Sequence, residues 1–388
     1  MFSERTNWKL APNRYTQALK EMRSSGESLI DLTLSNPTEC GLQYDSAAIL
    51  QAFQNDKAMA YQPHAKGLLV AREAVARYYH EDHGETVDPE SLLLTTSTSE
   101  AYSFVFRLLC NPHDEILVPK PSYPLFDFLG DLQDVTLRPY SLPYAHGWFI
   151  DFESLARALT PQTRAVLLVH PNNPTGSYVK EEEVVRLNEI CRGRDLALIV
   201  DEVFLDYARE GRARKSFVAN RDTLTFTLSG LSKIAALPQM KVAWMATTGP
   251  ESLVRASLER LEIIADTYLS LGSPTQWAIE RLVEQRRLLQ PQLMGRIREN
   301  WAALRSMSAS ERSFELLETE GGWYAVLRVA GSRSDDDAAI KIMRKTRVLV
   351  HPGHFYDFAG DGYLVVSLIV TAESFRTGMG RVLECLED

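Results

Sequence analysis

The sequence has few cysteines, no basic excess and no long apolar run, and each absence excludes a class of protein. The four cysteines, Cys40, Cys110, Cys191 and Cys385, lie far apart and form no CxxC pair. This spacing argues against a disulfide framework and against a zinc site. The formal net charge is −9, so no nucleic acid or other polyanionic partner is expected. The longest apolar runs, such as Leu196–Val200, are far too short to span a bilayer.

The first segment, MFSERTNWKL, lacks the apolar core of a signal peptide. Widely spaced cysteines also suit a reducing compartment. Hydrophobic residues make up 45% and charged residues 24% of the 388 residues, which is typical of a soluble globular protein large enough for several domains. We therefore expect a cytoplasmic protein without a membrane partner.

Short β-branched runs alternate with amphipathic stretches, the order that is typical of a βαβ protein. Runs such as AVLLV and LALIV are apolar throughout, as expected for strands buried on both faces. The expected strands are Leu92–Thr95, Glu115–Val118, Ala165–Val169, Leu196–Val200, Thr223–Leu228 and Val242–Ala246. Helical patterns such as Ser99–Leu109 and Lys180–Arg192 separate them, so we predict an α/β fold with a mostly parallel sheet between helices.

After Pro250 the pattern changes, and a second, smaller α/β domain is expected. It would comprise a long helix over Trp277–Ser308, a strand at Trp323–Val329, and helices at Asp336–Lys345 and Ala372–Leu386. The expected organisation is an N-terminal arm packing on the small domain at 1–45, a large domain at 46–285 and the small domain at 286–388.

Polar residues follow several expected strands, at the sheet edge where open α/β sheets bind ligands. The segment TTSTSEAYSF places Thr98 and Ser99 at a helix entry, which can bind phosphate, although Ser and Thr are also ordinary N-caps. The segment HPNNPTG specifies a sharp turn. That turn is either purely structural or presents the side-chain amide of Asn173 to a ligand.

Two charged residues also end strands. Asp201 ends an apolar run and needs a partner, which a lysine, an arginine or a protonated ring nitrogen could supply. Lys233 follows LSGLS, and a lysine in a tight, partly buried loop can have its pKa lowered and act as a nucleophile. Taken singly, a helix-capping aspartate and a surface lysine are the ordinary alternatives. Their occurrence together, in this order, favours a functional site.

Seven short motifs follow one another along the chain: SNPT at Ser35, YQPHAKG at Tyr61, PSYP at Ser122, NNPTG at Asn172, DEVF at Asp201, SGLSK at Ser229 and GGWY at Gly321. In this order they resemble the class I/II pyridoxal-phosphate-dependent aminotransferases, the aspartate-aminotransferase-like family of fold type I. The resemblance implies a seven-stranded type of sheet and pyridoxal 5′-phosphate as cofactor. It also implies ping-pong transfer of an amino group between an amino acid and a 2-oxo acid, in a homodimer with shared active sites.

The resemblance assigns a role to each candidate residue. Lys233 would be catalytic, forming a Schiff base with the cofactor and moving the Cα proton. Asp201 would pair with the pyridine nitrogen, and Asn173 would donate to the ring's 3-oxygen. Other implied cofactor contacts are Tyr123 on the ring face, Phe204 near the 3-oxygen, Ser97, Thr98, Ser99, Ser232 and Lys241 at the phosphate, and Tyr61 at the phosphate of the neighbouring subunit. Asn36 and Asn173 would contact the substrate.

Three cofactor positions depart from the family pattern. Phe204 stands where many relatives have a tyrosine, so a donor to the 3-oxygen is lost. Lys241 stands where an arginine is usual, which keeps the charge but not the bidentate geometry. Ser97 replaces a common glycine, so the phosphate turn must form without a positive φ.

The largest departure is Val365, in the run GYLVVSL, where relatives carry the arginine that binds the substrate α-carboxylate. Either Asn173, Asn36 or an arginine from elsewhere holds the carboxylate, or the substrate makes no conventional carboxylate contact. Val365 therefore keeps open a lyase or decarboxylase reaction on the same fold. A non-catalytic, cofactor-sensing module is a further alternative, disfavoured because both Lys233 and Asp201 are present.

The histidines give weaker signals, and no metal site is expected from them. The segment HEDH at His80–His83 matches no zinc-helix spacing and is interpreted as a solvated helix end. His351 and His354 follow a strand in a turn, where hydrogen-bonded structural histidines are the first interpretation and a substrate contact the second. His64 lies close to Tyr61 and could face the partner's site.

Overall fold

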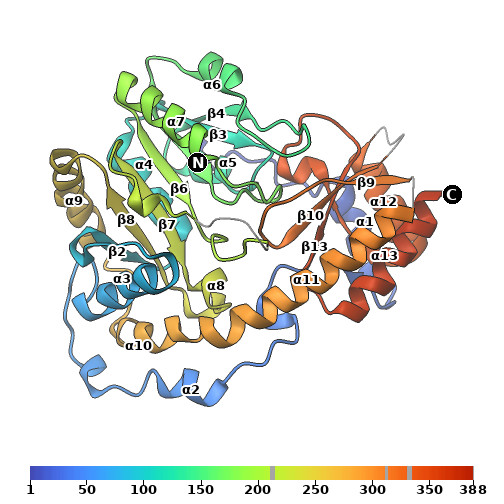
Figure 1. Cartoon of the computed structure of the whole chain (residues 1–388), viewed down its shortest axis with the longest axis horizontal. Coiled ribbons are helices and arrows are strands. Elements are labelled where there is room, and N and C mark those ends of the chain that lie inside the picture. The colour runs from blue at the N-terminus through green and yellow to red at the C-terminus, as the bar shows by residue number, and fades with distance from the viewer. Residues whose placement is uncertain (210–214, 311–312, 330–333, 388) are drawn as a thin grey trace.

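The computed structural model describes residues 1–388 apart from 210–214, 311–312, 330–333 and 388. Its main feature is a seven-stranded sheet in the order β2-β8-β7-β6-β5-β3-β4 (Figure 1). The strands are β2 (Leu92–Thr95), β3 (Glu115–Lys120), β4 (Thr136–Ser141), β5 (Thr163–Val169), β6 (Ala197–Asp201), β7 (Thr225–Gly230) and β8 (Ala243–Thr248). Only β8 runs antiparallel to its neighbours. The predicted α/β fold with a mostly parallel sheet is confirmed.

Helices cover both faces of this sheet. The larger ones in this part of the chain are α3 (Leu69–His83), α4 (Thr98–Leu109), α5 (Phe126–Leu132), α6 (Phe152–Ala158), α7 (Glu181–Arg194) and α9 (Glu251–Asp266). Leu167 of β5 shares a core with Tyr102 of α4 and Leu261 of α9. The next residue, Leu168, shares the opposite core with Leu187 of α7. Successive side chains point to opposite faces, so two apolar cores explain why the strand is hydrophobic throughout.

A second, smaller sheet lies beside the C-terminal helices. It is antiparallel, in the order β12-β13-β10-β9, with β9 (Phe314–Leu316), β10 (Tyr324–Val329), β12 (His351–Pro352) and β13 (Tyr363–Ser367). The accompanying helices are α10 (Ser273–Glu284), α11 (Arg286–Ser310), α12 (Asp335–Thr346) and α13 (Ala372–Glu387). Figure 1 shows α11 running from the large sheet to the small one. The division at residues 45 and 285 stays a prediction.

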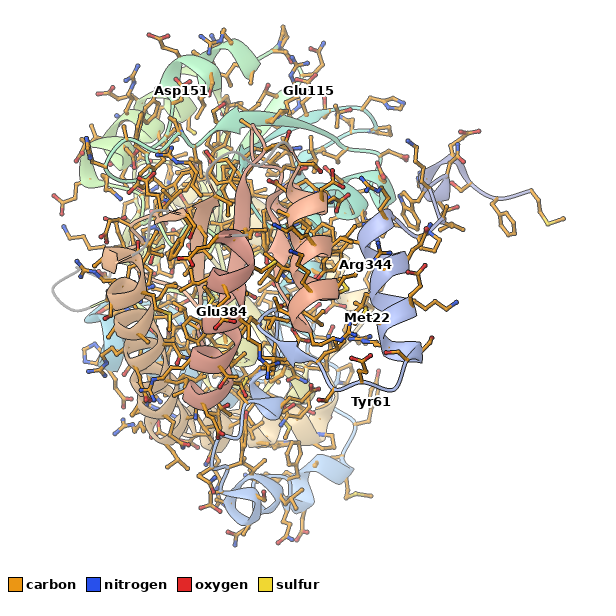
Figure 2. The ribbon with its side chains drawn as sticks, turned by 90° about the vertical axis from the view of Figure 1, so that its right-hand side faces the viewer. Met22, Tyr61, Glu115, Asp151, Arg344 and Glu384 are labelled. Atoms are coloured by element: carbon orange, nitrogen blue, oxygen red, sulfur yellow. The ribbon has the colours of Figure 1, made fainter. Side chains whose placement is uncertain are left out.

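The N-terminal residues contact both parts of the molecule. The first α-helix is α1 (Arg14–Ser24), and the strand that follows it, β1 (Ile30–Asp31), pairs with β11 (Val348–Leu349). Figure 2 shows α1, which carries Met22, beside the helix that carries Arg344. The side chain of Trp8 instead donates to Asp131 of α5 at 2.8 Å. Contacts of this segment therefore extend beyond the small sheet to the helices of the large one.

Two of the differences from the expected elements concern the large sheet and the long helix. Strand β4 was not predicted, because it lies at the edge of the sheet and its run TLRPYS is mostly exposed or half-buried. The helix expected over Trp277–Ser308 is two helices, because α10 ends at Glu284 and α11 begins at Arg286. Within the described part of the chain, none of the helices has the length and hydrophobicity that crossing a bilayer requires.

Candidate active site

The predicted site residues gather at the carboxyl ends of strands in the large sheet. Asp201 is the last residue of β6, and Lys233 lies in the short helix α8 (Leu231–Ile234) directly after β7. Ser97 caps α4 after β2, and Asn173 follows β5. These four strands run in one direction, so their carboxyl ends meet at the same edge of the sheet.

A cavity of about 280 Å³ opens at this edge. Nine of the predicted residues line it: Ser97, Thr98, Ser99, Tyr123, Asn173, Asp201, Phe204, Ser232 and Lys233. The remaining lining residues are Ser35, Phe126, Val169, Val203, Gly230, Pro238, Ala243 and Tyr324. Folding thus brings together most of the predicted site residues, which lie far apart in the sequence.

Two aromatic rings lie beside the amine of Lys233. Its Nζ lies 4.7 Å from the ring centroid of Trp323 and 5.6 Å from that of Phe204. Burial lowers the pKa of Lys233 to about 8, and the nearby Asp201 opposes part of this shift. The hydroxyl of Tyr207 donates to the main-chain carbonyl of Lys233 at 2.5 Å. An amine of lowered pKa is more often unprotonated at neutral pH, as a nucleophile requires.

The carboxylate of Asp201 receives two hydrogen bonds inside the protein. Oδ1 accepts from the main-chain nitrogen of Val203 at 3.0 Å, and Oδ2 accepts from the hydroxyl of Tyr102 at 2.9 Å. Burial raises the pKa of Asp201 to about 6, while both hydrogen bonds act to lower it. Sequence reasoning missed Tyr102, because a tyrosine on the apolar face of a helix has the pattern of an ordinary core residue. The two hydrogen-bond donors stabilise the charged carboxylate of Asp201, which can then pair with a buried cation.

Hydroxyl groups surround the N-terminus of α4. Ser97 has φ −162° and ψ 159°, an extended conformation that any residue adopts, so serine in place of glycine needs no special turn. Its Oγ accepts from the main-chain nitrogen of Glu100 at 3.2 Å. The hydroxyl-bearing residues Thr98, Ser99 and Ser232 line the same cavity. A helix N-terminus with nearby hydroxyls is a suitable site for a phosphate group.

Asn173 lines the cavity with an amide whose oxygen is unsatisfied. It is 7% exposed, and its Oδ1 has no hydrogen-bond partner among the described residues. The neighbouring Asn172 instead fixes the turn, since its Oδ1 accepts from the hydroxyl of Thr175 at 2.9 Å. At Gly176, φ is 68° and a Cβ would lie 2.3 Å from the carbonyl oxygen of Gly321. An unpaired buried amide lining a cavity fits a site for a polar ligand such as pyridoxal phosphate.

Three predicted residues lie outside this cavity. Lys241 is exposed and adopts φ 52°. Asn36 caps a short helix at 37–39, and its Nδ2 donates to Glu39 at 2.7 Å, so its amide is engaged away from the cavity. Tyr61 is 80% exposed and lines a separate pocket.

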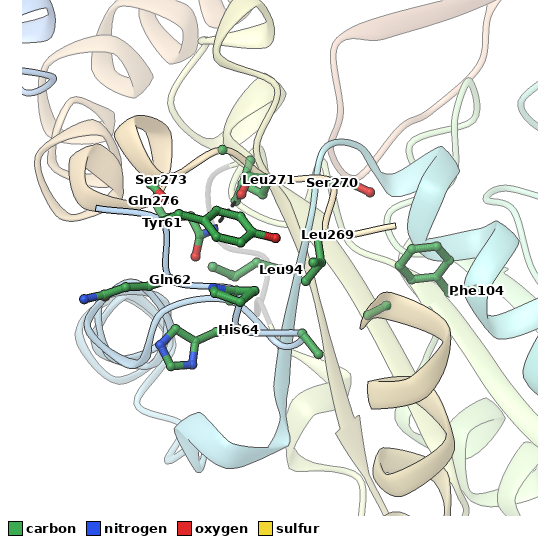
Figure 3. Close-up of a pocket in the computed structure, with 15 residues that line it drawn as sticks. Tyr61, Gln62, His64, Leu94, Phe104, Leu269, Ser270, Leu271, Ser273 and Gln276 are labelled. Atoms are coloured by element: carbon green, nitrogen blue, oxygen red, sulfur yellow. Dashed lines mark hydrogen bonds between the residues drawn. The ribbon is translucent and has the colours of Figure 1, made fainter. Parts of the chain in front are cut away.

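The pocket at Tyr61 has a volume of about 140 Å³. Figure 3 shows the tyrosine ring among Leu94, Leu269 and Gln276, with His64 nearby. His64 lines the same pocket as Tyr61, and its facing the partner's site stays a prediction. The described residues of this chain leave most of the Tyr61 ring open to solvent.

The histidines differ partly from expectation. His80 is exposed, as a solvated helix end requires. His83 is not solvated: its side chain is buried, and Nε2 lies 3.0 Å from both Asp206 and the hydroxyl of Tyr78. The expectation was wrong for His83 because the end of α3 packs against the loop that follows β6. His351 is half-buried, and its Nδ1 is hydrogen-bonded to the hydroxyl of Tyr356 at 3.0 Å, as expected for a structural histidine.

Val365 is fully buried in the small sheet. It pairs with Val326 of β10 and with His351 of β12. Tyr324 precedes Val326 by two positions and lines the cavity, so Val365 lies on the same face of the sheet as Tyr324. The structure provides no arginine at this position.

Comparison with known proteins gives the family. The family model described as aminotransferase class I and II matches residues 27–381, and the chain belongs to this family. The family depends on pyridoxal phosphate. Glutamate-pyruvate aminotransferase AlaA of Escherichia coli (strain K12) is 28% identical over 262 residues, which cover 67% of this chain and 65% of that protein. The match thus spans just under two thirds of that relative's length.

Two other proteins are similar over nearly their whole length. AlaA of Haemophilus influenzae is 25% identical over 364 residues, covering 91% of this chain and 89% of that protein. The structure of an alanine aminotransferase from Pyrococcus furiosus has a TM-score of 0.89 with 21% identity and covers 100% of both chains. At this level of identity, the structural match shows that the fold is shared.

Proposed function

We propose that this protein is a pyridoxal-phosphate-dependent aminotransferase that moves an amino group between an amino acid and a 2-oxo acid by a ping-pong mechanism. Lys233, Asp201 and Asn173 converge on one cavity at the carboxyl edge of the sheet, and this convergence carries the proposal. Similar proteins are named glutamate-pyruvate and alanine aminotransferases, which supports substrates of this class.

Three residues would perform the chemistry. The bound cofactor supplies a ring that accepts the electrons released at the substrate's Cα. The amine of Lys233 would hold the cofactor and then take up and return the Cα proton. The carboxylate of Asp201 would keep the ring nitrogen protonated, and the amide of Asn173 would donate to the ring's 3-oxygen and contact the substrate.

The other predicted residues would position the cofactor. Tyr123 would cover one face of its ring, and Phe204 would pack beside the 3-oxygen without donating a hydrogen bond. The phosphate would be bound by Ser97, Thr98, Ser99 and Ser232, with the charge of Lys241 at a greater distance.

We infer in addition a cytoplasmic homodimer with shared active sites. Large side chains such as Tyr61 (80% exposed), Met59 (90%) and Ile263 (71%) are typical of an interface when they gather in a patch. Tyr61 would then reach the phosphate in the neighbouring subunit. Each subunit would comprise the arm at 1–45, the large domain at 46–285 and the small domain at 286–388.

Incubation of the purified protein with pyridoxal phosphate and a panel of amino acids and 2-oxo acids tests the function. We expect a new amino acid and a new 2-oxo acid in equal amounts, and only when both substrates are present. Release of ammonia or carbon dioxide without an acceptor would indicate a lyase or decarboxylase instead. The Lys233→Ala variant serves as the control and should form no product.

A further inference from the structure

The cavity around Lys233 has little positive charge for a substrate carboxylate. Among the residues that line it in the described part of the chain, Lys233 is the only lysine or arginine. In the proposed function the amine of Lys233 holds the cofactor and moves a proton, so it cannot also serve as a fixed counter-ion. Asp201 adds a negative charge to the same cavity. Among the described residues of one subunit, a carboxylate entering here would lie near an anion and meet no cation other than Lys233.

Two arginines of neighbouring segments make hydrogen bonds to residues that do not line the cavity. Arg209 donates from Nη2 to the hydroxyl of Thr319 at 2.7 Å and lies 4.1 Å from the ring centroid of Trp301. Arg296 donates to the main-chain carbonyl of Cys40 at 3.4 Å. Neither arginine lines the cavity. The charge missing at Val365 is therefore not restored by these side chains.

Two neutral, hydroxyl-bearing residues, Ser35 and Tyr324, line the cavity. Tyr324 shares its sheet face with the buried Val365, and its ring lies 6.3 Å from that of Tyr356. Burial raises the pKa of Tyr324 to about 12, so its hydroxyl is uncharged at neutral pH. Hydroxyls both donate and accept hydrogen bonds, which suits a carboxamide or an alcohol. For a carboxylate, they replace only part of the hydration that is lost on burial.

We propose that this site takes its amino donor without a charge contact to the carboxylate, so that amino acid amides and amino alcohols are donors at least as good as the amino acids themselves. This inference rests on the proposed aminotransferase function. In the half-reaction the donor's Cα–H and Cα–N bonds break, and its nitrogen and hydrogen pass to the cofactor. The cofactor's bond to the amine of Lys233 is released, and a water molecule supplies the oxygen of the new carbonyl group on the donor carbon. The donor is thereby oxidised to a 2-oxo amide or a hydroxyketone, and the cofactor is reduced to its amine form.

The test compares matched donors in the half-reaction, followed by the absorbance of the bound cofactor. The donors are L-alanine, L-alaninamide and L-alaninol, and the same series from L-phenylalanine. In the wild type we expect rate constants for the amides and alcohols that equal or exceed those for the acids. Val365→Arg should shift the acid-to-amide ratio toward the acid by about 10- to 100-fold. Val365→Leu is the neutral control and should leave the acid-to-amide ratio unchanged. The donors differ in the basicity of their amines, but this difference cancels because the same ratio is compared between variants.

Calorimetric titration of the holoenzyme with 3-phenylpropionate and 3-phenylpropionamide makes the same comparison without turnover. Equal or tighter binding of the amide to the wild type supports the inference. A preference of the wild type for the acid over the matched amide, in rate or in affinity, overturns it. Should Val365→Arg fail to fold, the wild-type comparisons decide alone. If no donor converts the cofactor, the proposed function fails, while the calorimetric comparison still tests the charge preference.

Discussion

The hydroxyl of Tyr102 donates a hydrogen bond to Oδ2 of Asp201 over 2.9 Å, and both side chains are buried. Burial raises the pKa of Asp201 to about 6, and the hydrogen bond counteracts that shift by stabilising the carboxylate. Tyr102 therefore helps Asp201 to remain charged at neutral pH. In the proposed function this charge holds the proton on the cofactor's ring nitrogen, so Tyr102 acts as a positioning residue.

We expect Tyr102→Phe to raise the pKa of Asp201 further and to weaken cofactor binding by about tenfold at neutral pH, because a hydrogen bond to a charged group is lost. Binding should fall as pH decreases through the pKa of Asp201, and in the variant this fall should occur at higher pH. Fluorescence titration with pyridoxal phosphate across pH measures both effects.

Tyr140→Phe is the matched control. Tyr140 is equally buried, and its hydroxyl donates to the main-chain carbonyl of Leu167 at 2.9 Å. Tyr140 does not line the cavity. This variant should lose some stability without a shift in the pH dependence of cofactor binding. Identical pH profiles for the two variants would contradict the role given to Tyr102.

The lowered pKa of Lys233 has a kinetic consequence. In cofactor-free protein, the rate of covalent capture of pyridoxal phosphate should rise with pH through a midpoint near 8, because the amine is protonated and unreactive below its pKa of about 8. Stopped-flow absorbance measures this rate. A midpoint close to the ordinary lysine value of about 10.4 would contradict the effect of burial.

Phe204 gives a spectroscopic prediction. Its ring packs edge-on against Trp323, with 5.3 Å between centroids, and it lines the cavity. Phe204→Tyr would supply a donor to the cofactor's 3-oxygen and stabilise the negative charge there. We expect the pH midpoint of the bound cofactor's visible absorbance to move downward in this variant. An unchanged or higher midpoint would show that the tyrosine hydroxyl does not reach the ring.

Arg286 joins α3 to α11 away from the cavity. Its side chain is 1% exposed and binds Glu81, Asp82 and Glu284. Arg286→Met removes the hydrogen bonds to three partly exposed carboxylates, so we expect the free energy of unfolding to fall by about 1 to 2 kcal/mol. Arg287 is the control, because it also binds Glu81 but is 61% exposed. Arg287→Met should change the free energy of unfolding by less than about 0.5 kcal/mol. Equal losses in denaturant unfolding would contradict this account.

The parts of the site that sequence reasoning located share a physical signal. Asp201 and Lys233 end strands whose apolar runs are easy to identify, and ligand groups gather at that edge of a sheet. Tyr102 carried no such signal, because its role depends on a contact with a residue 99 positions away. The edge strand β4 was missed because a strand with few buried side chains lacks a continuous apolar run. His83 was misjudged because burial of a helix end depends on which segment packs against it.

The central claim is that Lys233 binds pyridoxal phosphate through its amine. Reduction of the holoenzyme with borohydride, followed by proteolysis and mass spectrometry, tests this claim most directly. We predict that the phosphopyridoxyl group is recovered on the peptide that contains Lys233, and that Lys233→Ala abolishes the labelling. Recovery of the label on another lysine, or of no label from protein incubated with the cofactor, would contradict the account.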